Sequence, residues 1–265
     1  MIKGIIFDLD DTLTVHDDLY DFNYLKTIKT FFPNFQMDNL EVLKIMIDTI
    51  DSIGSKKYFS KYLDAKFGGR DILWADCGGY GEIAEHLKEF HIEAQSEMWI
   101  NILKNLGVSD KYIKIKNIVD KYKFFMWSGI KAFDDVIPFL TKLNNYKIGI
   151  LTNGMQLHQR RKISASGLLK FFSNTNSTIV TSSECLKGKP FETPYKFICE
   201  KLSLDYSEII MIGDTLDGDI SGAKKLNIKN VLINRKNMNN SGNLIKPDFE
   251  IKSLKEMEKT IDYFL

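Results

Sequence analysis

The feature that most constrains the fold of this chain is a series of short apolar segments that each run directly into polar residues. The first, at residues 2–7, is mostly aliphatic and aromatic and leads into the acidic stretch 8–11. Four similar segments follow in the second half of the chain, at 147–151, 178–181, 208–212 and 230–233. Short apolar runs rich in β-branched residues are typical of strands buried on both faces of a parallel sheet. The chain is therefore predicted to contain such a sheet, with polar side chains at the carboxyl ends of its strands.

Helix-like stretches separate these segments, at 135–143, 157–172, 193–202 and 219–226. An alternation of strands and helices predicts an α/β fold, here a doubly wound, Rossmann-like parallel sheet. Folds of this class bind ligands outside the carboxyl ends of their strands. The candidate site residues are the polar residues at or just beyond those ends: Asp8, Asp10, Thr152, Lys189, Asp214 and Asp219.

Residues 15–128 show no such alternation. Their apolar residues recur at helical spacing, and the glycine pairs at 68–69 and 78–79 mark turns. We predict that this segment is an inserted, mainly helical cap domain. Residues 1–14 and 129–265 would then form the α/β catalytic core.

The charge balance of the chain limits its partners. Its 36 Lys and Arg residues face 35 Asp and Glu residues, which gives a formal net charge of +1. A nearly neutral chain gives no reason to expect a nucleic acid polymer or an anionic membrane as its partner. A small anionic substrate stays compatible with this charge, because a pocket can be positive while the whole chain is neutral. No apolar run approaches the ~18 residues of a membrane span.

The cysteines bear on the compartment. Cys77, Cys185 and Cys199 lie far apart and form neither a disulfide framework nor a zinc motif. Lys3 places charge where a signal peptide would need an apolar core. These features favour a cytoplasmic protein, which we expect to be a monomer or a homodimer.

Two acidic side chains suggest a metal site. Asp8 and Asp10 are two residues apart at a strand end, so in extended geometry their side chains face the same way. Two carboxylates about 4 Å apart repel each other by roughly 4 kcal/mol at an effective dielectric near 20. A divalent cation would offset this repulsion, and Mg²⁺ fits oxygen ligands best, whereas the lack of His and Cys at the strand ends argues against zinc. The alternative is an acidic turn that caps a helix.

Four segments resemble the motifs of haloacid dehalogenase-like phosphatases. Residues 8–12, Asp-Leu-Asp-Asp-Thr, resemble the first motif, and Thr152 at the end of its segment resembles the second. Lys189 before a proline is similar to the third motif, and 213–219, which holds Asp214 and Asp219, is similar to the fourth. All four occur in the order of that family. The resemblance covers residues 1–14 and about 129–265, while the insert matches only by position and helical character.

The resemblance implies roles for the acidic residues. Asp8 would attack phosphorus and become an aspartyl-phosphate. Asp10 would protonate the leaving alkoxide and later take a proton from the attacking water. Mg²⁺ would be bound by the carboxylates of Asp8 and Asp214 and by the backbone carbonyl of Asp10. Asp219 would not bind the metal directly but would orient metal-bound water or Lys189.

The resemblance also implies a phosphate-binding group. Thr152, the backbone N–H groups of Asn153 and Gly154, and the ammonium group of Lys189 would hold the phosphoryl oxygens. The alternatives are ordinary turn chemistry for Thr152 and a solvated loop for Lys189. Lys187 lies two residues earlier and competes with Lys189, but the flanking glycine and proline favour Lys189.

Several reactions share these motifs within the family. Dehalogenases and phosphonatases lack the equivalent of Asp10, so its presence favours hydrolysis of a small phosphomonoester. Phosphomutases keep both aspartates and stay open as an alternative, as does a catalytically silent binding protein on the same fold. Two segments together resemble the branch that contains pyrimidine 5′-nucleotidases, N-acylneuraminate 9-phosphatases and archaeal glyceraldehyde 3-phosphate phosphatases. They are residues 151–154 followed by Gln159, Lys162, 167–168 and 171–172, and residues 231–235. Gln159 and Lys162 would otherwise belong to an exposed helix face.

The remaining polar residues receive structural interpretations. None of the four histidines is assigned a catalytic role, although His16 follows the first predicted strand and lies near the expected site. Lys66 and Arg70 are interpreted as a solvated basic turn, with contact to substrate as the alternative. Asp217 is interpreted as a solvated turn carboxylate.

Overall fold

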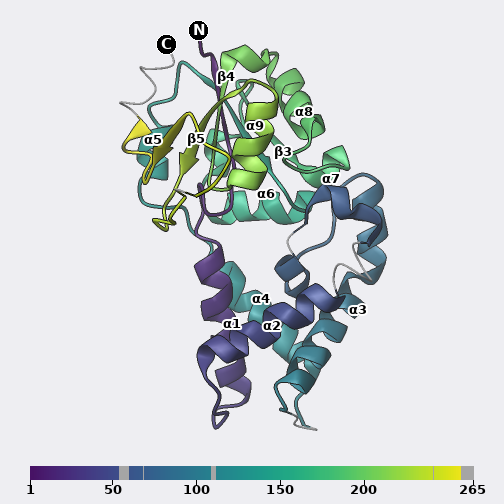
Figure 1. Cartoon of the computed structure of the whole chain (residues 1–265). Helices are drawn as coiled ribbons and strands as arrows, with labels where there is room; N and C mark the ends of the chain where they lie inside the picture. The colour runs from purple at the N-terminus through teal and green to yellow at the C-terminus, as the bar shows by residue number, and fades with distance from the viewer. Residues whose placement is uncertain (54–59, 68, 109–111, 241, 258–265) are drawn as a thin grey trace.

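The computed structural model describes residues 1–53, 60–67, 69–108, 112–240 and 242–257. It contains a six-stranded sheet in the order β3-β2-β1-β4-β5-β6, with all neighbouring strands parallel (Figure 1). The strands are β1 (Gly4–Phe7), β2 (Lys147–Thr152), β3 (Ser177–Thr181), β4 (Ile209–Gly213), β5 (Lys229–Ile233) and β6 (Phe249–Ile251). This topology confirms the predicted doubly wound, Rossmann-like sheet.

Alternate strand residues fill two apolar layers, one on each face of the sheet. Ile5 and Phe7 of β1 belong to one layer, whereas Ile6 belongs to the other. The first layer is covered by α5 (Val136–Leu140) and by Ile163 of α6 (Gln156–Ala165). The second layer is covered by α8 (Glu192–Leu202) and α9 (Ser221–Lys225), and α7 (Ser182–Cys185) follows β3. Both faces are buried, which explains why the strands are continuously apolar.

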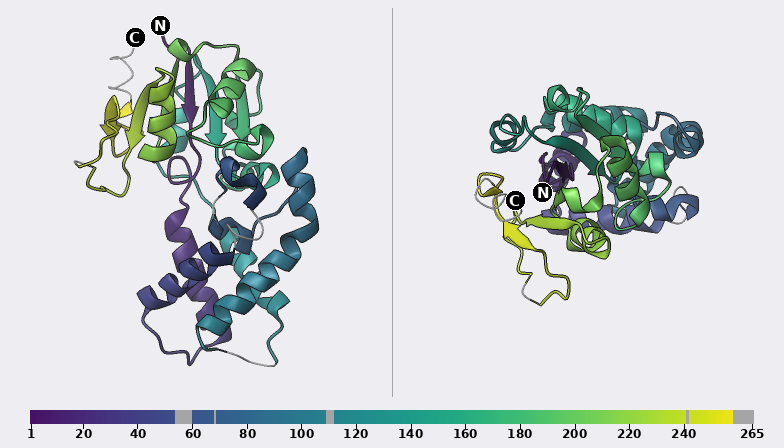
Figure 2. Two further views of the ribbon diagram at one scale, coloured as in Figure 1. Left: turned by 45° about the vertical axis from the view of Figure 1, so that its right-hand side comes forward. Right: turned by 90° about the horizontal axis from the view of Figure 1, so that it is seen from above.

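The insert between β1 and α5 is helical. It comprises α1 (Asp17–Phe31), α2 (Asn39–Ile53), η2 (Ser60–Ala65), η3 (Gly69–Leu73), α3 (Glu82–Asn105) and α4 (Ile115–Gly129). Figures 1 and 2 show these helices beyond the carboxyl end of β1, away from the N-terminus. The predicted mainly helical insertion is confirmed, and we call it the cap. Its limits at residues 15 and 128 stay a prediction, and Gly68 lies outside the described residues.

The cap has an apolar cluster of its own. Tyr24 of α1 stacks on Trp99 of α3 at 5.6 Å between ring centroids, and Trp99 meets Tyr122 of α4 edge-on at 5.3 Å. The cluster collects residues from all four long helices. At the junction with the sheet it also includes Met155, which precedes α6. The cap interior is therefore packed separately from the two layers that cover the sheet.

Some predicted elements differ from the observed ones. The helix expected at 157–172 ends at Ala165, because Gly167 adopts a φ of 74° and the chain continues as the short helix η4 (Leu169–Phe171). The helix expected at 219–226 is a π-helical turn, η6 (Leu216–Ile220), that runs into α9. Strand β6 was not predicted, because three residues are too few to show a periodicity.

The separate cluster generates a prediction about the stability of the cap. Trp99 is fully buried, so Trp99→Ala should lower the free energy of unfolding by about 3–5 kcal/mol through lost contacts and a residual cavity. Phe124, on the adjoining helix α4, is 61% exposed, and Phe124→Ala should cost less than about 0.5 kcal/mol. Urea unfolding followed by circular dichroism measures both changes. Similar losses in the two variants would show that the aromatic cluster does not stabilise the cap.

Candidate active site

The sheet topology brings distant residues together at one edge. The chain leaves β1 for β2 and β3 on one side of the sheet and returns to β4 on the other, so β1 is the point where the strand order reverses. Crevices at such a point are the usual ligand sites of this fold class. Asp8 follows β1, Thr152 ends β2 and Asp214 follows β4, and the Asp8 N–H donates to the carbonyl of Ile212 at 2.9 Å. These side chains therefore share one small region.

Lys189 lies among the carboxylates of this region. Its Nζ atom donates to Asp8 Oδ1 and lies 2.6 Å from Asp219 Oδ1. Asp8, Asp214 and Asp219 each offer an oxygen, and the three oxygens lie within 4.8 Å of one another. Asp8, Lys189 and Asp219 are buried, and Asp214 is half-buried. We call these four residues the carboxylate–lysine cluster.

The cluster carries an excess of negative charge. Burial raises the pKa of Asp8 to about 7, and the nearby ammonium group of Lys189 offsets this only in part. Burial and the charges of Asp8 and Asp219 likewise hold the pKa of Asp214 well above its ordinary value. Burial opposes the charge of Lys189, but the carboxylates of Asp219 and Asp8 outweigh it and raise the pKa of Lys189. Three carboxylates with one lysine fit a hard divalent cation held by oxygen ligands.

Asp10 has a different environment from Asp8. Both of its carboxylate oxygens accept from Lys162 Nζ, at 3.2 and 3.1 Å, and Oδ2 also accepts from Gln159 Nε2 at 2.9 Å. Burial would raise the pKa of Asp10, but the positive charges of His16 and Lys162 outweigh it and lower that pKa. The expected repulsion between Asp8 and Asp10 is present but small, because the ammonium group of Lys162 already pairs with Asp10. The Asp10 carboxylate turns toward α6. Its charge therefore shifts the pKa of Asp8 less than burial, Lys189 or Asp219 does.

Gln159 and Lys162 were not predicted as site residues. Both side chains are fully buried, so the alternative that they form an exposed helix face is wrong. They lie three residues apart on α6, which places them on the same side of the helix, and that side faces Asp10. Their positions after Thr152 suggested a branch of the family but did not show that the two side chains are buried.

The predicted phosphate-binding residues differ in whether their polar groups are free to contact a ligand. Thr152 is buried, and its Oγ1 accepts from Gln159 Nε2 at 2.6 Å, which leaves the hydroxyl proton free to donate. The Asn153 side chain accepts from the Lys189 N–H at 2.8 Å and donates to the Lys189 carbonyl at 3.2 Å, so it fixes the backbone of the lysine. The Gly154 N–H donates to Ser182 Oγ at 2.9 Å. Gly154 therefore uses its N–H inside the protein, contrary to the prediction that it faces phosphate.

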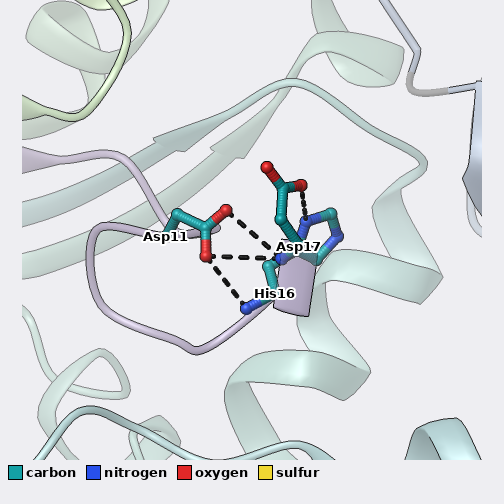
Figure 3. Close-up of side chains that lie close together, drawn as sticks. All are labelled: Asp11, His16 and Asp17. Atoms are coloured by element: carbon teal, nitrogen blue, oxygen red, sulfur yellow. Dashed lines mark hydrogen bonds and ion pairs between the residues drawn. The ribbon is translucent and has the colours of Figure 1, made fainter. Parts of the chain in front are cut away.

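A second acidic cluster lies at the start of the cap. Figure 3 shows Asp11, His16 and Asp17, in which the Asp11 carboxylate accepts the backbone N–H groups of His16 at 3.1 Å and of Asp17 at 3.2 Å. The ammonium group of Lys236 contacts Asp11 Oδ2 at 3.1 Å and Asp17 Oδ2 at 3.0 Å. The ammonium group of Lys236 therefore already balances part of the negative charge of Asp11 and Asp17. Asp11 satisfies the N–H groups at the beginning of α1, and the cluster has a structural explanation.

The remaining candidates do not belong to the carboxylate–lysine cluster, although Asp217 shares η6 with Asp219 and Lys66 lies beside Gly188. Lys187 Nζ lies over the Phe191 ring, 5.2 Å from its centroid, which leaves Lys189 as the lysine on Asp8. Arg70 pairs with Asp21 at 3.1 Å, and Lys66 and Asp217 are exposed. The exposure of Lys66 and Asp217 agrees with their structural interpretations, whereas Arg70 lies partly buried in η3 and not in a solvated turn.

Comparisons with known proteins identify the family. A model of the haloacid dehalogenase-like hydrolase family matches residues 2–227. The chain belongs to this family. The resemblance inferred from the four motifs is confirmed, and the chain is an enzyme of the hydrolase class. Among the described residues, no helix is long and apolar enough to cross a membrane.

Several relatives of this chain are named as phosphatases. The chain is 25% identical to glyceraldehyde 3-phosphate phosphatase of Methanocaldococcus jannaschii, over 97% of this chain and 96% of the relative. It is 28% identical to N-acylneuraminate-9-phosphatase of Mus musculus, over 86% of this chain and 80% of the relative. Among solved structures, the putative HAD-hydrolase YfnB of Bacillus subtilis has a TM-score of 0.66 at 19% identity, covering 98% of this chain and 99% of that chain. That likeness shows the fold.

The raised pKa of Asp8 generates a prediction about stability without metal. The pKa of Asp8 is about 7 in the folded protein, against an ordinary value of 3.8, so its contribution to stability is present below pH 3.8 and lost as the pH rises through 7. Asp8→Asn removes this cost, so in excess EDTA at pH 8 the variant should melt above the wild type. The difference should shrink as the pH is lowered from 8 toward 5.

Thermal melts of both proteins across this pH range measure the effect. Asp217→Asn, at an exposed carboxylate of the neighbouring turn, is the matched control and should melt like the wild type. An Asp8→Asn variant that melts below the wild type at pH 8 in EDTA would mean that Asp8 contributes more through its contact with Lys189 than its burial costs.

Proposed function

We propose that this hydrolase is a Mg²⁺-dependent phosphatase that acts on a small phosphomonoester through an aspartyl-phosphate on Asp8. The observation that carries the proposal is the contrast between two carboxylates only two residues apart. Asp8 faces Lys189 and two further acids, where a bound cation would favour its ionised form, while Asp10 is held outside that cluster by Lys162 and Gln159. Without metal the pKa of Asp8 is raised and that of Asp10 is lowered, so the assignment of roles rests on this placement and not on the pKa values. Pairs of carboxylates in different environments commonly divide the roles of nucleophile and proton carrier.

The proposed reaction proceeds in two steps. An Asp8 oxygen attacks phosphorus while the bond between phosphorus and the leaving oxygen breaks, and protonated Asp10 gives its proton to the departing alkoxide. Asp10, now ionised, then accepts a proton from a water whose oxygen attacks the phosphorus of the aspartyl-phosphate. Inorganic phosphate leaves, and both carboxyl groups return to their starting states. Lys189 and the Thr152 hydroxyl hold the phosphoryl oxygens during both steps.

The cofactor belongs to the same proposal. The carboxylates of Asp8 and Asp214 would hold Mg²⁺, together with the backbone carbonyl of Asp10, and Asp219 would keep Lys189 in place. Bound Mg²⁺ supplies charge neutralisation at the phosphoryl group. The relative YfnB, 27% identical over 139 residues, has a structure described as bound to magnesium, which supports this choice of cofactor.

The relatives support a choice of substrate to test first. Two proteins matched over 97% of this chain, from M. jannaschii and Methanopyrus kandleri, are named glyceraldehyde 3-phosphate phosphatase. We therefore propose glyceraldehyde 3-phosphate as the first metabolite to assay. N-acylneuraminate 9-phosphate and a pyrimidine 5′-nucleotide follow, on the names of more partial matches.

The dependence on metal and on Asp8 is the main test. Purified enzyme with Mg²⁺ should release inorganic phosphate from at least one of these esters, and excess EDTA should abolish the release, because the carboxylate–lysine cluster would then lack its cation. Asp8→Asn should be inactive, since an amide cannot form the acyl phosphate.

The outcomes separate the alternatives. Undiminished turnover in excess chelator would contradict the metal requirement. Conversion of a sugar phosphate into its isomer without phosphate release would favour a phosphomutase. Tight binding of the esters without turnover would favour a catalytically silent protein.

The proposed role of Asp10 generates a separate prediction. Asp10→Asn should lower kcat for an alkyl phosphate by about 10²–10⁴-fold, because an alkoxide must be protonated as it leaves. The loss for an aryl phosphate such as p-nitrophenyl phosphate should be much smaller, since nitrophenolate leaves without a proton. Steady-state kinetics on both substrates measure the difference. Equal losses would show that Asp10 acts only through its charge.

A further inference from the structure

Lys162 occupies an unusual place between the sheet and the cap. Its side chain is fully buried, and its Nζ atom lies 3.1 Å from Asp10 Oδ2 on one side and 3.6 Å from Asp71 Oδ1 on the other. Asp10 belongs to the catalytic edge of the sheet, whereas Asp71 belongs to η3 of the cap. A buried ammonium group is strongly unfavourable unless carboxylates pair with it. Lys162 therefore links a residue of the cap to the proposed proton carrier.

Asp71 is held firmly within the cap. The Tyr20 hydroxyl of α1 donates to Asp71 Oδ1, and the hydroxyl oxygen in turn accepts from Trp74 Nε1 at 3.0 Å. Across the interface, His158 Nε2 of α6 lies 3.4 Å from the same carboxylate oxygen, and the His158 and Trp74 rings meet edge-on at 4.3 Å. The Asp71 carboxylate is thus oriented by cap residues and directed at two core residues of α6.

This arrangement depends on contact between cap and core. If the cap moved away, Lys162 would keep Asp10 but lose Asp71, and Asp71 would lose both of its partners on α6. A buried carboxylate that loses its cationic partner destabilises the protein by several kcal/mol, unless water replaces that partner. His16, on the connection from the sheet into the cap, also lies 2.9 Å from Lys162 Nζ and 3.7 Å from Asp10 Oδ1. The groups around Asp10 are complete only when the cap rests on α6.

We propose that Asp71 is a positioning residue through which closure of the cap fixes Asp10, with Lys162 as the bridge between them. The inference rests on the proposed function, in which Asp10 carries the proton. In this proposal a closed cap does more than enclose the substrate, because closure also completes the contacts that orient the Asp10 carboxyl group. With the cap open, Asp10 would keep Lys162 and Gln159, but Lys162 would no longer be held from its other side by Asp71, so Asp10 would be less precisely oriented and hydrolysis would be slower.

The interface offers a matched control. Asp76 of the cap pairs across the same interface with Arg161 of α6, and its other oxygen lies 3.6 Å from Lys123. Asp76 is partly exposed, and among the described residues its ion pairs do not include Lys162. Asp71→Asn and Asp76→Asn therefore each remove one carboxylate charge from the interface, but only the first touches the bridge to Asp10.

The test compares two substrates in the full-length enzyme with Mg²⁺. For β-glycerophosphate, an alkyl ester, Asp71→Asn should lower kcat by about 10- to 100-fold, the scale of a misplaced catalytic group. For p-nitrophenyl phosphate, the loss should stay within about fivefold, because that leaving group needs no proton. Asp76→Asn should stay within about fivefold on both esters, as for a partly exposed ion pair.

Hydrogen exchange separates positioning from closure itself. The Gly188 N–H donates to the Asp64 carbonyl at 2.7 Å and the Tyr80 N–H donates to Gln156 Oε1 at 2.9 Å, so both amides report contact between cap and core. Their exchange should accelerate to a similar extent in Asp71→Asn and Asp76→Asn. If Asp71→Asn does not fold, Tyr20→Phe, which removes only the hydroxyl that orients Asp71, should show the same substrate pattern at a smaller size.

Each outcome bears on a defined claim. Equal losses on the two esters in Asp71→Asn, or losses no greater than those of Asp76→Asn, would overturn the positioning role while leaving the phosphatase intact. A wild-type enzyme that is inactive on both esters and on the metabolite phosphates would overturn the proposed function, and the inference with it.

Discussion

The candidate site depends on the ammonium group of Lys189. Three carboxylates, from Asp8, Asp214 and Asp219, converge within 4.8 Å in a largely buried region, where like charges repel and burial penalises each of them. Lys189 contacts Asp8 and Asp219, and its own backbone is fixed on both sides by the Asn153 side chain. One cation among three anions leaves a deficit of positive charge. That deficit makes the region suited to a divalent ion and a phosphoryl group together.

The pKa values of Asp8 and Asp10 shift in opposite directions because different elements supply the neighbours of the two carboxylates. The neighbours of Asp8 are Lys189, from the loop between α7 and α8, and Asp219 of η6, whereas those of Asp10 come from the buried side of α6 and from His16. The Asp10 carboxylate turns toward α6, so the two side chains do not share one environment. Two residues that are close in the sequence are thereby given different partners.

Most of the sheet and its acidic edge could be predicted from the sequence. Each strand is an apolar run followed by a polar residue, and parallel strands align their carboxyl ends, so Asp8, Thr152 and Asp214 had to meet. The role of α6 could not be predicted in the same way. Its sequence is polar on all sides, which is typical of a solvated helix, and only tertiary packing reveals that Gln159 and Lys162 are buried.

The cap was predictable as helical but not in its contacts. Apolar residues at helical spacing indicate helices, but they do not show which polar residue of the cap will face α6. Asp71 lies in a short 3₁₀ helix with no motif, and its importance arises from Lys162, a neighbour in space that lies far along the chain. The pairing of Asp71 with Lys162 depends on how the cap packs against the sheet domain. The spacing of residues along the sequence carries no information about that packing.

The separate packing of the cap has an evolutionary consequence. Its aromatic cluster around Trp99 meets the rest of the molecule mainly at junction residues such as Met155, while the sheet is covered by its own two apolar layers. Substitutions inside the cap can therefore accumulate without disturbing the strands that align the acids. Selection can therefore alter the interior of the cap while the strand ends that align the acids stay constant, provided that a carboxylate remains opposite Lys162.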